Sequence, residues 1–406
     1  MRRLVVPAPR GAPPLRWALL FCVVVAATPS PVVAQFRLPV KLSELEQVAS
    51  RDSNDAAAHY NLALAYWNAK RWDAVDRELR VAVTIEPQFA EGWLALSRLP
   101  FARRLGLWED IAQRRVPAES RPSLDEAYRL YQRALLINPL VDLRAEAAAR
   151  PARSAYWMAS EELEALYDHF FGGFDDIQTG DYAGAYNRFD QLVAEAPTRG
   201  DREALPEFVY YFRGLAAAHI NRWDEAIADF ERLLSKADAR QSRDSLLYYI
   251  PVETNQYRYM LGVLSQRAGR LADAEHYYRT ALVNDIGLYM AHARLATIAE
   301  SKGDWPTAAA ERRAAVNANP DDPSLLLDLG RTLSSWGDFA AASEALRQAV
   351  AANPRDSRGW YYLGIARQQL NKKEEARDAF SHFIAQAPSR YARQLDDAKH
   401  RLATIQ

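Results

Sequence analysis

The stretch LGRTLSSWGDFAAASEALRQAV, Leu329–Val350, decides the fold of this chain, because strings with the same spacing of small and large residues flank it on both sides. The related strings begin at Leu261, Leu295 and Leu363, so the spacing is 34 residues throughout. Two series of small residues have the same spacing of 34 residues. One consists of Ala274, Ala308, Ala342 and Ala376, and the other of Gly262, Ala296, Gly330 and Gly364. A fixed period of this length indicates a repeat array in which each repeat is one supersecondary unit.

Each repeat has the pattern of two antiparallel helices joined by a tight turn. A small residue at the crossing lets the two helices approach closely, a glycine ends the first helix, and a proline stops the second. The glycines that end the first helices are Gly269, Gly303 and Gly337. No unit of this kind can bury its apolar face alone, so we expect neighbouring units to stack and to bury one continuous core.

These strings resemble tetratricopeptide repeats, whose pattern places a large residue, a leucine, a small residue, a glycine, an alanine, an aromatic residue and a proline at fixed offsets. Two units fill much of this pattern, one with Trp360, Leu363, Gly364, Ala376, Phe380 and Pro388, the other with Leu329, Gly330, Gly337, Ala342, Ala349 and Pro354. The resemblance covers about eight units between residues 53 and 388. It implies an all-α fold, a right-handed superhelical solenoid of antiparallel helix pairs.

The repeats are contiguous only in the C-terminal part of the chain. We predict the following segments: a leader at 35–52, N-terminal units at 53–160 with insertions at 100–122 and 140–160, irregular units at 161–254, and four contiguous units at 255–388. A third insertion lies near 236–254. Residues 389–406 place Tyr391, Leu395, Ala398 and Leu402 on one face, which predicts a capping helix that closes the open end of the array.

One stretch, FGGFDDIQTGDYAGAYNRFD at Phe171–Asp190, combines paired glycines with carboxylates, a composition that phosphate and cation sites also have. Its residues nevertheless occupy the offsets of the repeat, with Gly173, Gly180, Tyr182, Ala185, Phe189 and Pro197 in the expected places. We therefore favour a helix crossing and a turn over a cation site. Asp175, Asp176 and Asp181 are then expected to face solvent near helix ends.

The N-terminus has the pattern of an export signal. Arginines precede the apolar run WALLFCVVVAA, and Val32-Val33-Ala34 suits cleavage before Gln35. The run is shorter than the roughly 20 residues of a membrane-spanning helix, so we favour a cleaved signal peptide at 1–34 over a retained anchor. The single cysteine, Cys22, lies in this segment, so the body of the chain has no disulfide framework. These features predict a protein of the bacterial periplasm or cell envelope.

The remaining sequence contains none of the familiar motifs of catalytic, metal-binding or nucleic-acid-binding sites. Removal of residues 1–34 leaves 47 basic and 52 acidic residues, a net charge of about −5, which gives no electrostatic reason to bind nucleic acid. The seven histidines have no metal-ligand spacing, and no phosphate-binding loop or nucleophile motif is found. We therefore predict no metal, no cofactor and no catalytic activity.

The architecture can bind a partner. In the family that the chain resembles, the first helix of each unit lines a concave groove, and the resemblance implies which positions face that groove. Read onto this sequence, they include Tyr60, Asn61, Trp67, Asn68, Phe208, Tyr211, Gln256, Tyr259, Arg267, Arg294, Arg331, Arg358, Tyr361 and Gln368. Aromatic rings beside arginine and amide side chains suit an extended peptide or a partner helix.

The sequence thus predicts a non-catalytic protein-interaction scaffold of the bacterial cell envelope. Two alternatives remain. The irregular region at 98–255 could form an enzyme site or bind a small ligand or lipid, or an uncleaved N-terminus could anchor an envelope assembly factor. Membrane association is the less favoured option. The amphipathic string PFARRLGLWEDIAQRRVP, Pro100–Pro117, would suit a membrane surface or a partner, but we favour packing of its apolar face over the array.

Overall fold

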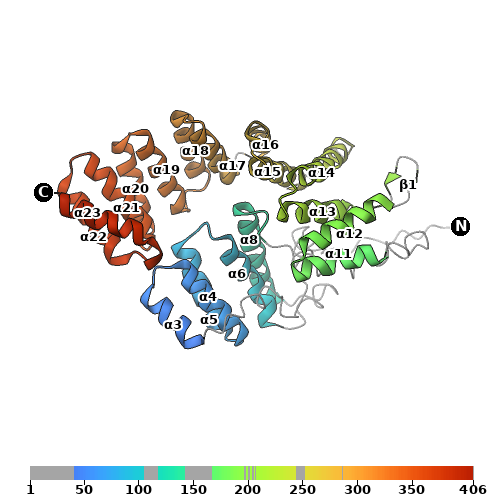
Figure 1. Ribbon diagram of the computed structural model, residues 1–406, viewed down its shortest axis with the longest axis horizontal. Helices are drawn as coiled ribbons and strands as arrows, with labels where there is room; N and C mark the ends of the chain where they lie inside the picture. The colour runs from blue at the N-terminus through green and yellow to red at the C-terminus, as the bar shows by residue number, and fades with distance from the viewer. Residues whose placement is uncertain are drawn as a thin grey trace.

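The computed structural model describes residues 41–104, 118–141, 167–195, 198–199, 202–203, 205, 207–243, 252–285 and 287–405 (Figure 1). The predicted signal peptide at 1–34, the leader up to residue 40 and parts of the three insertions, at 105–117, 142–166 and 244–251, lie outside the described residues. The predicted all-α solenoid of antiparallel helix pairs with a C-terminal capping helix is confirmed.

The N-terminal units consist of a leading helix and two helix pairs in the described chain. Helix α3 packs on α4, α4 pairs with α5, and α6 pairs with α8 across the insertion at 105–117. The bounds are α3 Leu42–Arg51, α4 Ala56–Asn68, α5 Trp72–Ile85, α6 Ala90–Arg103, the 3-10 turn η1 Ala118–Ser120 and α8 Arg121–Ile137.

The middle units pair α11 with α12 and α13 with α14. Between the pairs, two strands of two residues each, β1 Thr198–Arg199 and β2 Arg202–Glu203, form an antiparallel bridge. The helix bounds are α11 Tyr167–Thr179, α12 Tyr182–Glu195, α13 Glu207–His219 and α14 Trp223–Arg243. The stretch at 171–190 is therefore two helices and a turn. Asp176 differs from expectation, because it forms an ion pair with Arg188 at 2.8 Å and is only 22% exposed.

The C-terminal units form a regular stack of helix pairs that ends in a cap. The pairs are α15 Val252–Arg267 with α16 Leu271–Asn284, α17 Tyr289–Ser301 with α18 Trp305–Ala318, α19 Pro323–Trp336 with α20 Phe339–Ala352, and α21 Ser357–Gln369 with α22 Lys373–Gln386. The 3-10 turn η2 Ser389–Tyr391 then leads into the capping helix α23 Ala392–Thr404.

The turn inside each pair needs a residue in the left-handed backbone region. Glycine fills this position after α11, α15, α17 and α19, with φ between 72° and 92°. Where the sequence lacks glycine, Lys70, Asn221 and Asn371 adopt the same conformation with φ of 54° to 61°. Only glycine takes this conformation without a steric penalty from Cβ, and asparagine pays less than most other residues.

Aspartate caps several of the helices that follow these turns and the turns between units. The side chain of Asp338 accepts a hydrogen bond from the backbone N–H of Ala341 at 3.1 Å, and Asp304 does the same for Thr307 at 3.2 Å. Asp322 and Asp356 cap α19 and α21 in the same way. Each cap satisfies a backbone donor that the helix itself leaves free.

The chain doubles back on itself, so that its N-terminal units, α3–α8, lie beside its C-terminal units, α15–α23 (Figure 1). We call the contact between these two groups of helices the seam. The two groups run in opposite directions along it: the loop before α4 meets the end of α22, the end of α5 meets the turn before α21, and the end of α8 meets α15 and α17. The described array therefore closes on itself.

Candidate functional site

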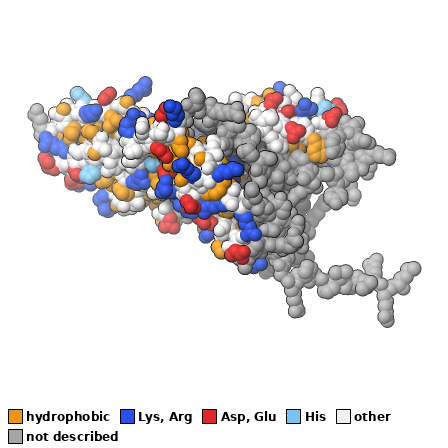
Figure 2. Space-filling view, turned by 90° about the horizontal axis from the view of Figure 1, so that it is seen from below, with side chains coloured by type: hydrophobic (Ala, Val, Ile, Leu, Met, Phe, Trp, Pro, Cys, Tyr) orange, Lys and Arg blue, Asp and Glu red, His pale blue; other side chains and the backbone are white. Residues whose placement is uncertain are grey.

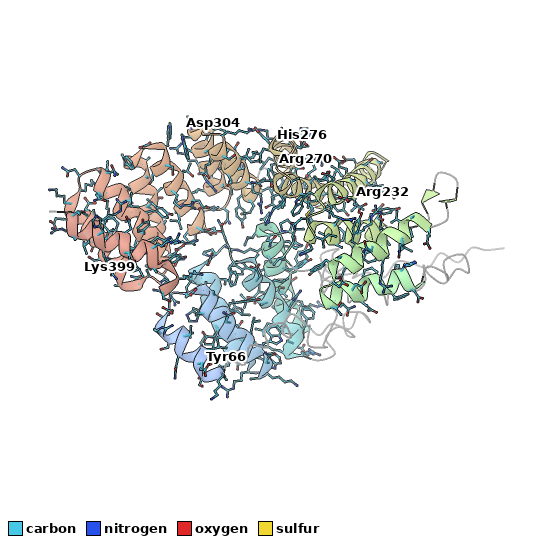
Figure 3. All side chains as sticks on the ribbon, viewed as in Figure 1. Tyr66, Arg232, Arg270, His276, Asp304 and Lys399 are labelled. Atoms are coloured by element: carbon cyan, nitrogen blue, oxygen red, sulfur yellow. The ribbon has the colours of Figure 1, made fainter. Side chains whose placement is uncertain are left out.

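The C-terminal units have two edges with different surroundings. The turns inside the pairs α15–α16 and α17–α18 face away from the N-terminal units. Arg270 and Asp304 stand in these turns, and His276 of α16 lies on the same side (Figure 3). The turns between successive units, around residues 319–322 and 353–356, face the seam. At this second edge, the C-terminal units therefore contact another part of the same polypeptide chain.

At one end of the seam, two predicted groove residues hold the last turn of α8. The Tyr259 hydroxyl donates to the carbonyl of Leu136 at 2.7 Å, and the Arg294 guanidinium donates to the carbonyl of Ile137 at 3.0 Å. Arg294 also donates to the Tyr259 oxygen at 2.9 Å. A helix leaves its last carbonyls without internal partners, so these two side chains complete the end of α8.

Tyr259 is nearly inaccessible, with 5% of its surface exposed. Burial raises the pKa of its phenol above the ordinary value, although the neighbouring Arg294 opposes this shift. The hydroxyl therefore stays protonated and acts as a donor to Leu136 while it accepts from Arg294. In this closed arrangement Tyr259 and Arg294 already have a polypeptide ligand, the end of α8.

A second helix end is held in the same way. The side-chain amide of Asn353 donates to the carbonyls of Thr84 at 2.8 Å and Ile85 at 3.3 Å, which belong to the last turn of α5. Asn353 is 7% exposed and stands in the turn between two units, where it also ends α20. The resemblance directs attention to first-helix positions, so it did not point to Asn353. The only sequence signal for it is the Asn-Pro pair of this turn.

Between these two ends, Arg133 of α8 forms an ion pair with Asp322 at 3.4 Å. Asp322 is 1% exposed and also caps α19, so one carboxylate serves both the helix start and the seam. Gln88 donates to the Ser324 hydroxyl at 3.1 Å close by. The middle of the seam is therefore polar.

Two other predicted groove residues bind the capping helix. The Tyr361 hydroxyl donates to Asp397 at 2.7 Å, and Arg401 donates to the amide oxygen of Gln368 at 2.9 Å. Burial and the hydrogen bond to Asp397 raise the pKa of Tyr361 to about 12. Arg358 contacts carboxylates from both sides of the seam, Asp356 of the C-terminal units at 2.7 Å and Glu86 of the N-terminal units at 3.9 Å.

The predicted residues of the N-terminal and middle units pack on neighbouring rings. Tyr60 contacts Phe89 edge to face at 4.9 Å, Trp67 contacts Trp72 at 5.7 Å, and Tyr211 contacts Phe230 at 5.6 Å. These three side chains and Asn61, Phe208 and Gln368 are half-buried. The side chains of Asn68, Gln256, Arg267 and Arg331 are exposed. Their role in partner binding stays a prediction.

An open pocket of about 420 Å³ lies where α5 begins. Lys70, Arg71 and Arg103 give it a basic character, but Arg103 forms an ion pair with Asp73 at 3.1 Å and donates to the carbonyl of Trp72. Within the described residues, no cluster of three or more histidines, cysteines or carboxylates is arranged to hold a metal ion. Among the described helices, none is long and apolar enough to span a membrane.

A family model described as tetratricopeptide repeat matches residues 259–323 and 327–391, the same units whose helix pairs and left-handed turns are described above. These two segments of the chain are tetratricopeptide repeats. The tetratricopeptide units at 259–391 are the regular part of the solenoid, and the more divergent units precede them.

Several solved structures resemble this tetratricopeptide solenoid at low sequence identity. The C-terminal part of a repeat-containing protein from Cytophaga hutchinsonii is 16% identical and covers 57% of this chain and 86% of its own, with a TM-score of 0.47. The MamA protein is 19% identical, and the match covers 44% of this chain and 91% of MamA, with a TM-score of 0.38. Yeast Tom70 is 14% identical and covers 96% of both chains, with a TM-score of 0.37. No curated protein matches the chain by sequence.

Proposed function

We propose that this protein is a non-catalytic protein-interaction scaffold of the bacterial cell envelope, which binds an extended peptide or a partner helix on the face formed by its first helices. Tetratricopeptide units support the general role of a scaffold. The envelope location rests on the signal-like residues 1–34 and on the absence of cysteine from the rest of the sequence.

One observation carries the proposal: side chains of this array already hold polypeptide backbone. Tyr259 and Arg294 bind the last carbonyls of α8, and Asn353 binds those of α5. Main-chain carbonyls are present in every polypeptide, so a surface that recognises helix ends within the chain has the chemistry to recognise them in a partner.

The surface chemistry suits a protein partner better than a polyanion. Acidic and basic side chains are interspersed with hydrophobic ones over the described part of the face that Figure 2 shows. Nucleic acid is bound mainly by clustered positive charge, whereas protein interfaces combine apolar contact with charges of both signs. We therefore propose protein or peptide partners and no nucleic acid.

In the described part of 98–255, the buried carboxylate has a structural partner. Asp229 receives two hydrogen bonds from Arg213, at 2.6 and 2.9 Å. Burial raises the pKa of Asp229, while the hydrogen bonds and charge of Arg213 oppose that shift. A carboxylate held in a bidentate pair stabilises the packing of α13 on α14, so this pair does not favour the enzyme alternative.

The test compares two arginines with the same local chemistry on different helices. Arg331 on the first helix α19 is 52% exposed, pairs with Asp328 three residues earlier and lies over the Tyr362 ring of the next first helix at 5.5 Å. Arg347 on the second helix α20 is 55% exposed and pairs with Glu344 three residues earlier. The two side chains thus differ mainly in the face that they occupy.

We expect Arg331→Ala combined with Arg267→Ala to weaken partner capture about fivefold or more, because arginines are common interface hot spots. Arg347→Ala should leave capture unchanged. The chain from Gln35 to Gln406 serves as bait in envelope extract, with captured proteins quantified by mass spectrometry and a photo-crosslinking residue placed at 331 or 347. Equal capture by both variants, together with equal crosslinking at 331 and 347, would show that the first helices do not form the interface.

A further inference from the structure

The end of the seam that is remote from α8 is held by hydrogen bonds and ion pairs. The loop Asp52–Asp55, between α3 and α4, lies against the end of α22 and the turn before α21. Arg355 donates to the side-chain oxygen of Asn54 at 3.0 Å and to the carbonyl of Ser53 at 2.6 Å. Asn54 in turn donates to the carbonyl of Gln386 at 3.4 Å.

Further contacts at this end join acidic side chains of the N-terminal units to the C-terminal units. Arg390 forms ion pairs with Asp55 at 3.2 Å and with Glu86 at 3.5 Å, and Ser389 donates to Asp52 through its N–H and its hydroxyl. Arg358 reaches Glu86 at 3.9 Å. The N-terminal units thus contribute acids and the C-terminal units contribute arginines. We call this set, Asp52, Asp55 and Glu86 with Arg355, Arg358 and Arg390, the clasp.

The two ends of the seam differ in their apolar contacts. At the α8 end, Leu136 packs against the core cluster that contains Tyr259, and Leu140 packs against the cluster of the middle units. At the clasp end, the buried cores of α3–α5 and of α19–α23 are separate clusters in the described residues. The seam is therefore anchored by apolar packing at one end and by polar contacts at the other.

These polar contacts are of the kind that opens readily. Arg390 is 36% exposed and Glu86 is 30% exposed, so water and salt reach the ion pairs. Exposed pairs of this kind contribute little each, and polar contacts between parts of one chain commonly allow relative motion. Charges more than a few ångströms apart are also screened at high ionic strength.

We propose that the clasp is a conformational switch: it holds the solenoid closed through residues 52–55 and 86, and its release opens the seam from the clasp end while the α8 end acts as the hinge. In the closed state the chain's own loop occupies Arg355 and Arg390, and the end of α5 occupies Asn353. Opening makes this edge available to a partner, so the clasp is autoinhibitory. Only this last consequence rests on the proposed function.

The experiment measures the opening directly, without a partner. Spin labels are placed at Ser50 on α3 and Ser381 on α22, two exposed serines on opposite sides of the clasp, in a full chain with Cys22→Ser. The distance between the labels is then determined by pulsed electron paramagnetic resonance. We expect Arg355→Gln with Arg390→Gln to raise the ratio of long to short distances about tenfold, since several ion pairs and hydrogen bonds are lost together.

The matched control is Arg331→Gln with Arg347→Gln, which removes the same charge from exposed arginines that pair within their own helices. It should keep the short distance. A second measurement uses the labelled chain with the clasp intact: raising sodium chloride from about 50 mM to about 1 M should populate the long distance, because the Debye length falls from more than 10 Å to about 3 Å.

A short distance that persists in the clasp variant, or one that is unaffected by salt, would overturn the proposal. Equal opening in the control would also overturn it, because charge loss in general would then be the cause. The partner-capture experiment has a separate readout: a chain that opens but captures nothing would reject the proposed function and leave the switch standing.

Discussion

Glycine at the helix crossing is the residue on which the packing of each unit depends. A Cβ added to Gly262 would lie 2.4 Å from the Tyr278 ring, and one added to Gly364 would lie 2.7 Å from the Phe380 ring. The facing residue follows sixteen positions after the small one in both pairs. In the first unit the same spacing pairs Ala63 with Leu79, so a smaller partner accompanies the larger crossing residue.

We predict that Gly262→Ala destabilises the protein by about 1–2 kcal/mol, because overpacking against a fully buried ring outweighs the gain in helix propensity. Helix propensity alone predicts the opposite sign, a gain of about 1 kcal/mol. Chemical denaturation of the variant, followed by circular dichroism, decides between the two.

The control is Gly262→Ala combined with Tyr278→Leu, which recreates the Ala63 and Leu79 pair of the first unit. In a double-mutant cycle we expect the two changes to couple favourably. A more stable single variant, or strictly additive changes, would show that the crossing has room for a methyl group.

At the scale of the element, the capping helix α23 depends on a few polar contacts beside its apolar face. Ala398 is buried against the cluster of Phe380 and Phe383, and Arg377 donates to the carbonyl of Ile405 at 2.6 Å. Asp397 accepts from Arg401 at 2.6 Å and from Tyr361 at 2.7 Å. Burial alone would raise the pKa of the Asp397 carboxyl, but the hydrogen bonds from Arg401 and Tyr361 outweigh it and hold the pKa below its usual range.

The lowered pKa of Asp397 determines how the stability of the capping helix depends on pH. A carboxyl whose pKa is lower in the folded state stabilises that state above its unfolded pKa of about 3.9, and the contribution disappears as the pH falls through the folded value. We predict that Asp397→Asn lowers the melting temperature at pH 7 and that the difference from the natural chain shrinks below about pH 4. Calorimetric scans of both proteins between pH 7 and pH 3 measure this difference in melting temperature.

Asp396, the exposed neighbour of Asp397, provides the control. Asp396→Asn should leave the melting temperature within about 1 °C at every pH, since surface substitutions away from such contacts have small effects. A difference for Asp397→Asn that stays constant down to pH 3 would contradict the assigned role of its charge.

At the scale of the whole molecule, the seam joins helices that are far apart in sequence. Asn353 and the carbonyl of Thr84 are separated by 269 residues, and Arg355 and Asn54 by 301. The closed shape in Figure 1 follows from such contacts, since each repeat unit by itself specifies only its immediate neighbours.

We predict that Asn353→Ala weakens the seam by about 1–3 kcal/mol, because it leaves two carbonyls in the last turn of α5 without the donor that Asn353 supplies. Hydrogen exchange read by mass spectrometry should become faster in α5 and α20 while α17 and α18 keep their protection. Gln348→Ala, an exposed amide on α20 that contacts Glu344 of the same helix, should change neither. Unchanged exchange in Asn353→Ala would mean that this amide does not hold the seam.

The sequence by itself determined the helix pairs, their left-handed turns, the small residues at the crossings and the cap. These features depend on contacts within one 34-residue unit or with the next, and such local contacts leave a period that can be read along the chain. Even the departures follow this rule, since Asn221 and Asn371 stand where other units have glycine.

Only the tertiary structure decided what covers the inner edge of the C-terminal units. Tyr259 and Arg294 occupy predicted groove positions, but the end of α8 fills the space beside them, and Asn353 and Arg355 act from turns that the repeat pattern leaves unspecified. The physical reason is that the seam consists of individual polar and apolar contacts between distant segments. Such contacts repeat at no fixed interval, so no periodicity in the sequence records which segment will lie against which.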